Sequence, residues 1–316
     1  MKLILKRVCS LVIDNYRKVK EELRFDGDYI NHFAAVIYSK QNSAIDVNKI
    51  KKIRSTIKNK TSRVSCFRGD ILYIVSILIG KEDNADTFID ELISTYNMFL
   101  EVGFKESEYL VISAYSVVKH CKKEERLGVI LRMKNIFKDI KNKYYNLTNE
   151  EDYVECALLA INNIDKEKSS KYMENKFNSI TELNMFSHNG VQGLVIALLL
   201  NNSISEVYSV RDLLIKLQQK NVHVSNQCLP LLGIVAGGVG QDQFASTIKE
   251  VAKYLGDQEP EYEFYMDRSF RTFLIMAINE LAKESDNERY LDEFISLGVY
   301  SFILSKNQGM LSEILA

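Results

Sequence analysis

A small residue in the middle of an apolar stretch recurs seven times along the chain, at Ala34, Ser76, Ser113, Ala157, Ala197, Ala236 and Ala277. Successive positions are 42, 37, 44, 40, 39 and 41 residues apart. Each apolar stretch is followed by a short polar break and then by a longer, charged, amphipathic stretch. A period near 40 residues built from two helices is typical of helical-hairpin arrays, in which each unit buries its apolar face against its neighbours. The sequence therefore predicts an all-α, α-solenoid-like array of about seven helical hairpins after an N-terminal helix.

Residues that break helices are scarce, which favours long helices. The 316 residues include only two prolines, Pro230 and Pro260, and 14 glycines, and a proline inside a helix removes a hydrogen bond and clashes with the preceding turn. We expect the N-terminal helix at 2–24. Apolar helices should begin near Asp28, Asp70, Ser107, Asn149, Asn189, Ser225 and Asp267, each capped by a short polar side chain. Charged helices should cover 46–60, 85–102, 123–145, 166–184, 205–221, 241–256 and 287–305.

Nothing in the composition marks a linker between these helices. We therefore predict a single all-helical repeat domain over residues 1–316, and the glycine cluster at 237–240 is the one candidate for a weak joint. Because the repeat units differ in length by up to seven residues, we expect the array to stay open. A closed α/α ring is the alternative.

Two stretches carry a resemblance to a known family. They are HFAAVIYSKQNSAIDVNKIKKIRSTIKNKTSRVSCFRGDILYIVSILIG and FIDELISTYNMFLEVGFKESEYLVISAYSVV, with the Ser65–Arg68 segment and then Tyr96, Gly103-Phe104, Ser107 and Tyr109-Leu110 as their motifs. The chain resembles the domain-of-unknown-function 4003 family, uncharacterised helical proteins of Gram-positive bacteria, from about residue 10 to its end. The resemblance implies a helical fold. It carries no activity, cofactor or catalytic motif.

Charge and cysteine usage narrow the classes of function. The 41 basic and 42 acidic residues leave a net charge of −1, which argues against a dedicated nucleic-acid binder. Five scattered cysteines show no metal-ligand or redox spacing, and the four histidines have no ligand partner at helical spacing. We therefore predict no metal and no other cofactor, and a reducing cytoplasm as the location.

No segment of the sequence is typical of secretion or of membrane insertion. Lys6, Arg7 and Asp14 interrupt the apolar runs of the N-terminus. The most apolar stretch, residues 71–79, is far shorter than the roughly 20 residues that span a bilayer. We therefore expect no membrane association, and the oligomeric state stays open.

Polar side chains gather at the expected starts of the apolar helices. If these helices stack in parallel, their free N–H groups and positive dipole ends line one edge, which suits an anion or a carboxylate-bearing partner. The candidate ligand-binding residues on this edge are Arg68, Asp70, Glu108, His188, Gln192 and Arg271, and Asp28, Asp152 and Asp267 lie in the same row. An ordinary solvated rim, with His188 as a simple cap, is the alternative. We interpret His32 as a buried, hydrogen-bonded histidine and not as a ligand.

Two charged helices are strongly basic. Residues 49–63 contain seven basic residues and no acidic one, and residues 122–143 include Arg126, Arg132, Lys134 and Lys138 beside aromatic residues. Such ridges can contact phosphates, although solvation is the usual explanation of a charged outer helix. We expect a cytoplasmic binding or scaffold module for a peptide or protein partner, without catalytic residues. An enzyme or small-ligand sensor with a polar pocket at the apolar-helix starts is the alternative, and nucleic-acid binding through the basic helices is the second alternative.

Overall fold

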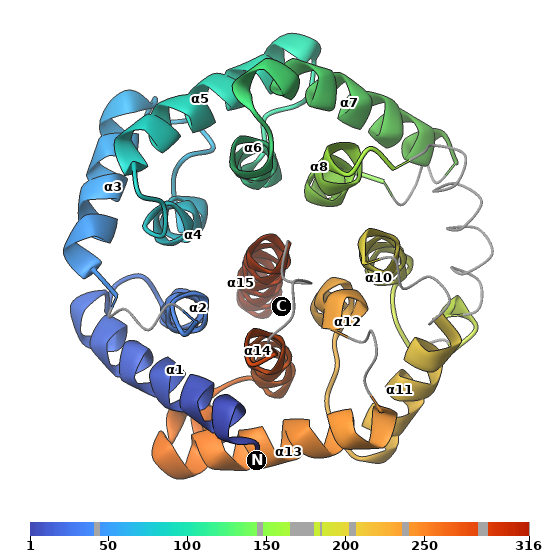
Figure 1. Ribbon diagram of the computed structural model, residues 1–316. Coiled ribbons are helices and arrows are strands. Elements are labelled where there is room, and N and C mark those ends of the chain that lie inside the picture. The colour runs from blue at the N-terminus through green and yellow to red at the C-terminus, as the bar shows by residue number, and fades with distance from the viewer. Residues whose placement is uncertain are drawn as a thin grey trace. The chain divides into compact units, whose positions relative to one another are not determined.

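The computed structural model describes residues 1–40, 45–143, 148–164, 180–183, 185–201, 207–235, 240–283 and 290–315. All regular structure in these residues is helical (Figure 1), which confirms the all-α prediction. The chain divides into two compact units, unit 1 (Met1–Ile45 and Ser205–Ala316) and unit 2 (Asp46–Ile204). The single domain stays a prediction. The joint expected at 237–240 falls within unit 1, and residues 237–239 lie outside the described part.

Unit 2 alternates charged and apolar helices. They are α3 (Val47–Lys60), α4 (Asp70–Ile79), α5 (Ala85–Val102), α6 (Glu108–His120), α7 (Arg126–Lys143), α8 (Tyr153–Ile161) and α10 (His188–Leu200), with short 3₁₀ turns η1 (Lys123–Glu125) and η2 (Glu150–Asp152) before α7 and α8. Each charged helix packs mainly on the apolar helix that follows it: α3 on α4, α5 on α6 and α7 on α8. The sequence suggested that each apolar helix pairs with the charged helix that follows it, because the polar break after an apolar stretch is shorter than the break before it. Most of the charged helix expected at 166–184 lies outside the described residues.

Unit 1 brings helices from both ends of the chain together. It contains α1 (Leu3–Glu22), α2 (Asp28–Ile37), α11 (Val207–Gln219), η4 (Asn226–Cys228), α12 (Leu229–Val235), α13 (Gln241–Gln258), the π-helical turn η5 (Glu261–Tyr265), α14 (Arg268–Leu281) and α15 (Leu291–Leu315). Helix α1 packs on α2, α13 and α14, and α2 also packs on α14 and α15 (Figure 1). An open array stacked in sequence order contains no such contact, so that expectation is wrong within unit 1. The apolar faces of α1 and α2 are instead covered by the C-terminal helices.

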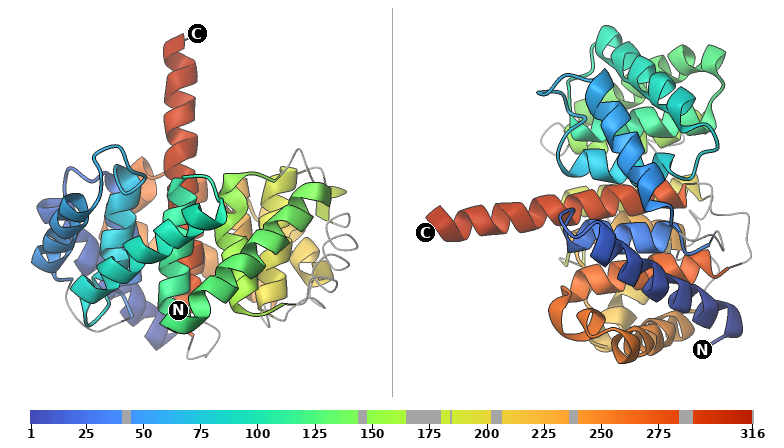
Figure 2. Two further views of the ribbon diagram at one scale, coloured as in Figure 1. Left: turned by 90° about the horizontal axis from the view of Figure 1, so that it is seen from above. Right: turned by 90° about the vertical axis from the view of Figure 1, so that its left-hand side faces the viewer.

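Helix α15 corrects the expectation of an exposed, charged helix at 287–305. Its first half is buried, as shown by Leu291, Phe294, Ile295 and Val299, and it packs on α2, α12 and α14. Between its two first acidic residues and Ser305 the sequence is mostly apolar on every side of the helix, which is typical of an interior helix. The C-terminal part of α15 extends beyond the other helices of unit 1 (Figure 2).

The repeated small residues are interior positions, as predicted. The six that the structure describes are 0% exposed: Ala34, Ser76, Ser113, Ala157, Ala197 and Ala277. Ala236 lies outside the described residues. The Ser76 hydroxyl donates to the Leu72 carbonyl at 2.6 Å, and the Ser113 hydroxyl donates to the Tyr109 carbonyl at 2.8 Å. A serine bonded to its own helix is both small and satisfied, so neighbouring helices can approach it closely.

The starts of the apolar helices differ in detail from the prediction. Side-chain caps are present at the starts of α6, η2, α10 and α14, from Ser107, Asn149, Ser187 and Asp267. Helices α2 and α4 instead follow glycines, Gly27 (φ 90°) and Gly69 (φ 61°), in a backbone conformation that disfavours other residues. Asp28 and Asp70 are therefore first-turn residues and not caps. Every helix in the described part of the chain is too short or too polar to span a bilayer.

Candidate functional site

The predicted ligand-binding residues fall in both units. Arg68, Asp70, Glu108, His188 and Gln192 belong to unit 2, and Arg271 belongs to unit 1. The Arg68 guanidinium donates to the carbonyls of Lys58 at 3.0 Å, Thr61 at 2.7 Å and Phe67 at 2.9 Å. It therefore closes the C-terminal end of α3, where helix carbonyls lack partners within the helix. Arg68 stabilises the fold locally, and these bonds account for its position.

Unit 2 joins two of the polar residues at helix starts. The Gln192 amide, buried in α10, donates through Nε2 to Oδ1 of Asp152 at 2.7 Å, and Oδ2 of Asp152 accepts from the Asn149 N–H at 2.9 Å. Glu155, one turn further along α8, is also buried. Burial raises the pKa of Asp152 to about 7 and that of Glu155 to about 8. The Asp152–Gln192 hydrogen bond thus links the start of α8 to α10, and the charge of Asp152 acts on the buried Glu155. Sequence reasoning missed Glu155 because it stands inside an apolar string.

Asp70, Glu108 and His188 lie in the first turns of α4, α6 and α10, as expected. Burial raises the pKa of Asp70. In the part of the chain that the structure describes, no group of three or more His, Cys, Asp or Glu side chains is arranged to hold a metal ion.

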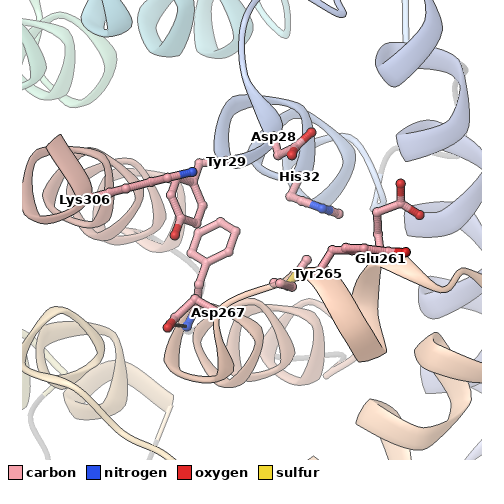
Figure 3. Close-up of a pocket in the computed structure, with 9 residues that line it drawn as sticks. Asp28, Tyr29, His32, Glu261, Tyr265, Asp267 and Lys306 are labelled. Atoms are coloured by element: carbon pink, nitrogen blue, oxygen red, sulfur yellow. Dashed lines mark hydrogen bonds between the residues drawn. The ribbon is translucent and has the colours of Figure 1, made fainter. Parts of the chain in front are cut away.

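A cleft opens in unit 1 where the starts of α2 and α14 meet α15 (Figure 3). Three carboxylates (Asp28, Glu261, Asp267), three aromatic rings (Tyr29, Tyr265, Phe270) and the side chains of His32, Met266 and Lys306 line it. Its cavity volume of about 60 Å³ suits one side chain or one small group. The cleft lies at two apolar-helix starts, and Asp28 and Asp267 of the predicted row line it, but none of the six predicted ligand-binding residues does.

A buried aromatic stack supports the cleft. His32 is 2% exposed, and its ring stacks on that of Tyr16 with centroids 4.0 Å apart. Nδ1 of His32 lies 3.1 Å from the Tyr262 hydroxyl, which confirms the buried, hydrogen-bonded histidine. Burial, and then the charge of Lys20, lowers the pKa of His32 to about 3. The imidazole is therefore neutral and a weak base, unlike a general base, whose pKa lies near the working pH.

The carboxylates make the cleft electronegative. Asp28 begins α2, and its carboxylate makes no hydrogen bond or ion pair with any residue that the structure describes. Asp267 caps α14 by accepting from the Phe270 N–H at 2.9 Å, and Glu261 pairs with Lys20. Burial, and then the charges of Asp267 and Asp28, raises the pKa of Tyr29. The two carboxylates therefore act on the tyrosine in the cleft and favour a positive charge beside it.

Aromatic side chains also line the cleft, and others are exposed on the segments next to α2 and α14 in the sequence. The ring of Tyr29 meets that of Phe270 edge to face, with centroids 4.2 Å apart. Phe264 and Tyr265, on the π-helical turn η5, are 72% and 81% exposed, and Phe25, just before α2, is 85% exposed. Large exposed aromatic side chains are typical of protein interaction sites. Single π-helical turns are also frequent at functional sites.

Arg271 does not line the cleft but binds the backbone of η5. Its Nη1 donates to the Tyr262 carbonyl at 2.7 Å and lies 3.4 Å from the Glu263 carbonyl. It lines a separate hollow with Lys253, Asp257 and Glu263. Because Arg271 holds the backbone of η5, it positions the turn that carries the exposed aromatic residues.

The two basic helices of unit 2 have partners within the fold. Basic side chains of α3 and α7 contact acidic side chains of α5, in the pairs Lys52–Asp86, Lys60–Asp90 and Arg126–Glu91. Others donate to carbonyls near helix C-termini, where a cation is favourable: Lys49 to Glu82 at 2.8 Å and Arg132 to Ala160 at 3.3 Å. These contacts give five of the basic residues a structural role that requires no nucleic acid.

Sequence reasoning came close to the cleft without finding it. Asp28 and Asp267 stood in the predicted row, whereas Tyr29, Glu261 and Tyr265 were not singled out. The missed signal is the density of acidic and aromatic residues in 257–267, directly before an apolar helix. Lys306 has no local signal, because its place in the cleft depends on the meeting of the two chain ends.

Comparison with known proteins identifies a family. The family model described as "Protein of unknown function (DUF4003)" matches residues 15–308, nearly the whole chain, which confirms the resemblance noted in the sequence. No curated protein and no solved structure matches the chain.

Proposed function

We propose that this chain, which belongs to the DUF4003 family, is a binding module whose unit 1 cleft takes a cationic side chain of a protein partner. The observation that carries the proposal is the convergence of three carboxylates and three aromatic rings on one small cavity (Figure 3). A cation over an aromatic face gains about 0.5–1 kcal/mol at exposed sites and more when desolvated. Nearby carboxylates add a Coulomb term of the same sign.

The sign of the charge differs from the one expected from free helix N-termini. Those N–H groups and dipole ends favour an external anion only where no carboxylate of the protein already lies at the helix start. In unit 1 the carboxylates of Asp28 and Asp267 already lie at the starts of α2 and α14. The remaining preference of the cleft is therefore for a cation.

The exposed aromatic residues of η5 support a protein as the source of that cation. Tyr265 lines the cavity, Phe264 precedes it in the same turn, and both are mostly exposed, and aromatic side chains are enriched at the centres of protein interfaces. The cavity volume of about 60 Å³ admits a lysine or arginine head group, and apolar neighbours in the partner would cover the exposed rings. A segment in which basic and apolar residues alternate fits both features.

Binding fits the cleft better than catalysis does. Its buried histidine has a pKa lowered to about 3, so it offers no proton acceptor matched to neutral pH. The hairpin-repeat architecture and a cytoplasmic location belong to the same proposal. They are supported by the period near 40 residues and by the absence of a disulfide among the five cysteines, all of which lie in the described part of the chain.

The test is fluorescence anisotropy with a labelled peptide of alternating lysine and phenylalanine. We expect it to bind, and a peptide of alternating glutamate and phenylalanine not to bind. Asp28→Asn removes one carboxylate from the cleft and should weaken binding by about fivefold, which corresponds to roughly 1 kcal/mol. Asp14→Asn is the matched control, because Asp14 is an exposed residue of the same unit that does not line the cleft. Equal affinity of the two variants, or equal binding of the two peptides, would refute the proposal.

A further inference from the structure

The cleft already contains a cation from its own chain. Lys306 projects from α15 toward Tyr29 of α2 (Figure 3), and its Nζ lies 5.1 Å from the centroid of the tyrosine ring. This distance is within the range of a cation–π contact. Lys306 also lies among the residues that line the cavity.

We propose that Lys306 is an internal ligand of the cleft, and that a lysine of the partner replaces it when the partner binds. The proposal rests on the function proposed above and specifies the chemistry of the partner's cation as an ammonium group. The intramolecular contact shows that the geometry accepts a lysine presented from a helix. The incoming lysine would meet the same ring and the carboxylate of Asp28.

The position of Lys306 on α15 permits this exchange. The helix is anchored by its buried first half, up to Phe302 and Ile303, whereas the side chains at 305–308 are exposed. Lysine is a flexible side chain with a strongly hydrated head group, so it can leave the ring for water without loss of core packing. Displacement therefore requires only a change of rotamer.

Self-occupancy lowers the apparent affinity for any partner. A site that is open only part of the time binds with its intrinsic affinity multiplied by the open fraction. A single exposed cation–π contact shifts this fraction by about two- to fivefold. The partner must therefore compete with a lysine that the chain itself holds near the cleft at high local concentration.

The test measures binding of the labelled lysine–phenylalanine peptide to charge variants of the full chain. Lys306→Met keeps the length of the side chain and removes the cation, so we expect affinity to rise about two- to fivefold. Lys306→Arg keeps the cation and should bind like the wild type. Lys249→Met removes the same charge from an exposed position of unit 1 outside the cleft, and it controls for the general attraction of a basic peptide.

The outcomes separate the two proposals. If Lys306→Met binds no more tightly than Lys249→Met while the wild type binds, the internal ligand is refuted and the proposed function stands. If no variant binds the peptide, the proposed function fails and the inference falls with it. A gain confined to Lys306→Met supports both.

Discussion

Replacing Glu155 by glutamine should change how the stability of the protein depends on pH. Glu155 is 6% exposed and lies one turn from Asp152 on α8. Burial, and then the charge of Asp152, raises its pKa from 4.5 to about 8. In the unfolded chain the carboxyl group ionises near its ordinary pKa, whereas the folded protein keeps it protonated to higher pH.

The sign of the effect follows from proton uptake on folding. Between about pH 4.5 and about pH 8 the folded state binds one more proton at this site than the unfolded state does, so stability falls as the pH rises. The slope is about 1.4 kcal/mol per pH unit. From about pH 5.5 to about pH 7.5, Glu155 should therefore lower the free energy of unfolding by roughly 2–3 kcal/mol. Glutamine does not titrate, and Glu155→Gln should lose this share of the slope.

The assay is urea unfolding of the wild type and of Glu155→Gln at the two pH values, followed by circular dichroism. The matched control is Glu124→Gln, an exposed acid of the same unit, which should keep the wild-type slope. Parallel pH dependence of Glu155→Gln and the wild type would refute the reasoning. Such a result would mean that the Glu155 carboxyl group ionises with an ordinary pKa and is not held in a dry interior.

Three further predictions concern packing and the basic helices. A Cβ added at Gly298 of α15 would overlap the buried ring of Phe273 on α14. Gly298→Ala should therefore lower the free energy of unfolding by about 1–3 kcal/mol, and an unchanged melting temperature would contradict that close contact. Ala157→Arg places an unpaired guanidinium at a position that is 0% exposed, so the variant should unfold or aggregate. A soluble variant that melts at the wild-type temperature would show that the position is not internal. Duplex DNA should not bind measurably at about 0.15 M salt, because basic residues of α3 and α7 already contact acidic residues of α5. Micromolar binding that weakens steeply with salt would restore the nucleic-acid alternative.

The repeat pattern was sufficient to predict the interior of the fold. Small residues at a period near 40 are buried wherever the structure describes them, and α5 has the predicted bounds, Ala85–Val102. These features depend on local periodicity and on capping, which the sequence contains directly. The interior position of α15 was missed because two acidic residues at its start made it resemble the charged helices that precede it.

The candidate site was only partly predictable, because it is a product of long-range packing. Asp28 and Asp267 could be placed at helix starts from local signals alone. Their meeting with Lys306 requires the packing of α2 on α14 and α15, and no local pattern encodes that contact. Arg68 was misjudged for the converse reason: the carbonyls that it binds lie within ten residues, but only the loop geometry after α3 reveals them.

Hydrogen–deuterium exchange with and without the lysine–phenylalanine peptide tests the central claim most directly. If the partner's cation enters the unit 1 cleft, amide exchange should slow in residues 25–33 and 259–271, which carry the carboxylates and rings of the cleft. Exchange in α3 and α7 of unit 2 should stay unchanged. Protection confined to those basic helices, or binding without protection of either cleft segment, would contradict the account.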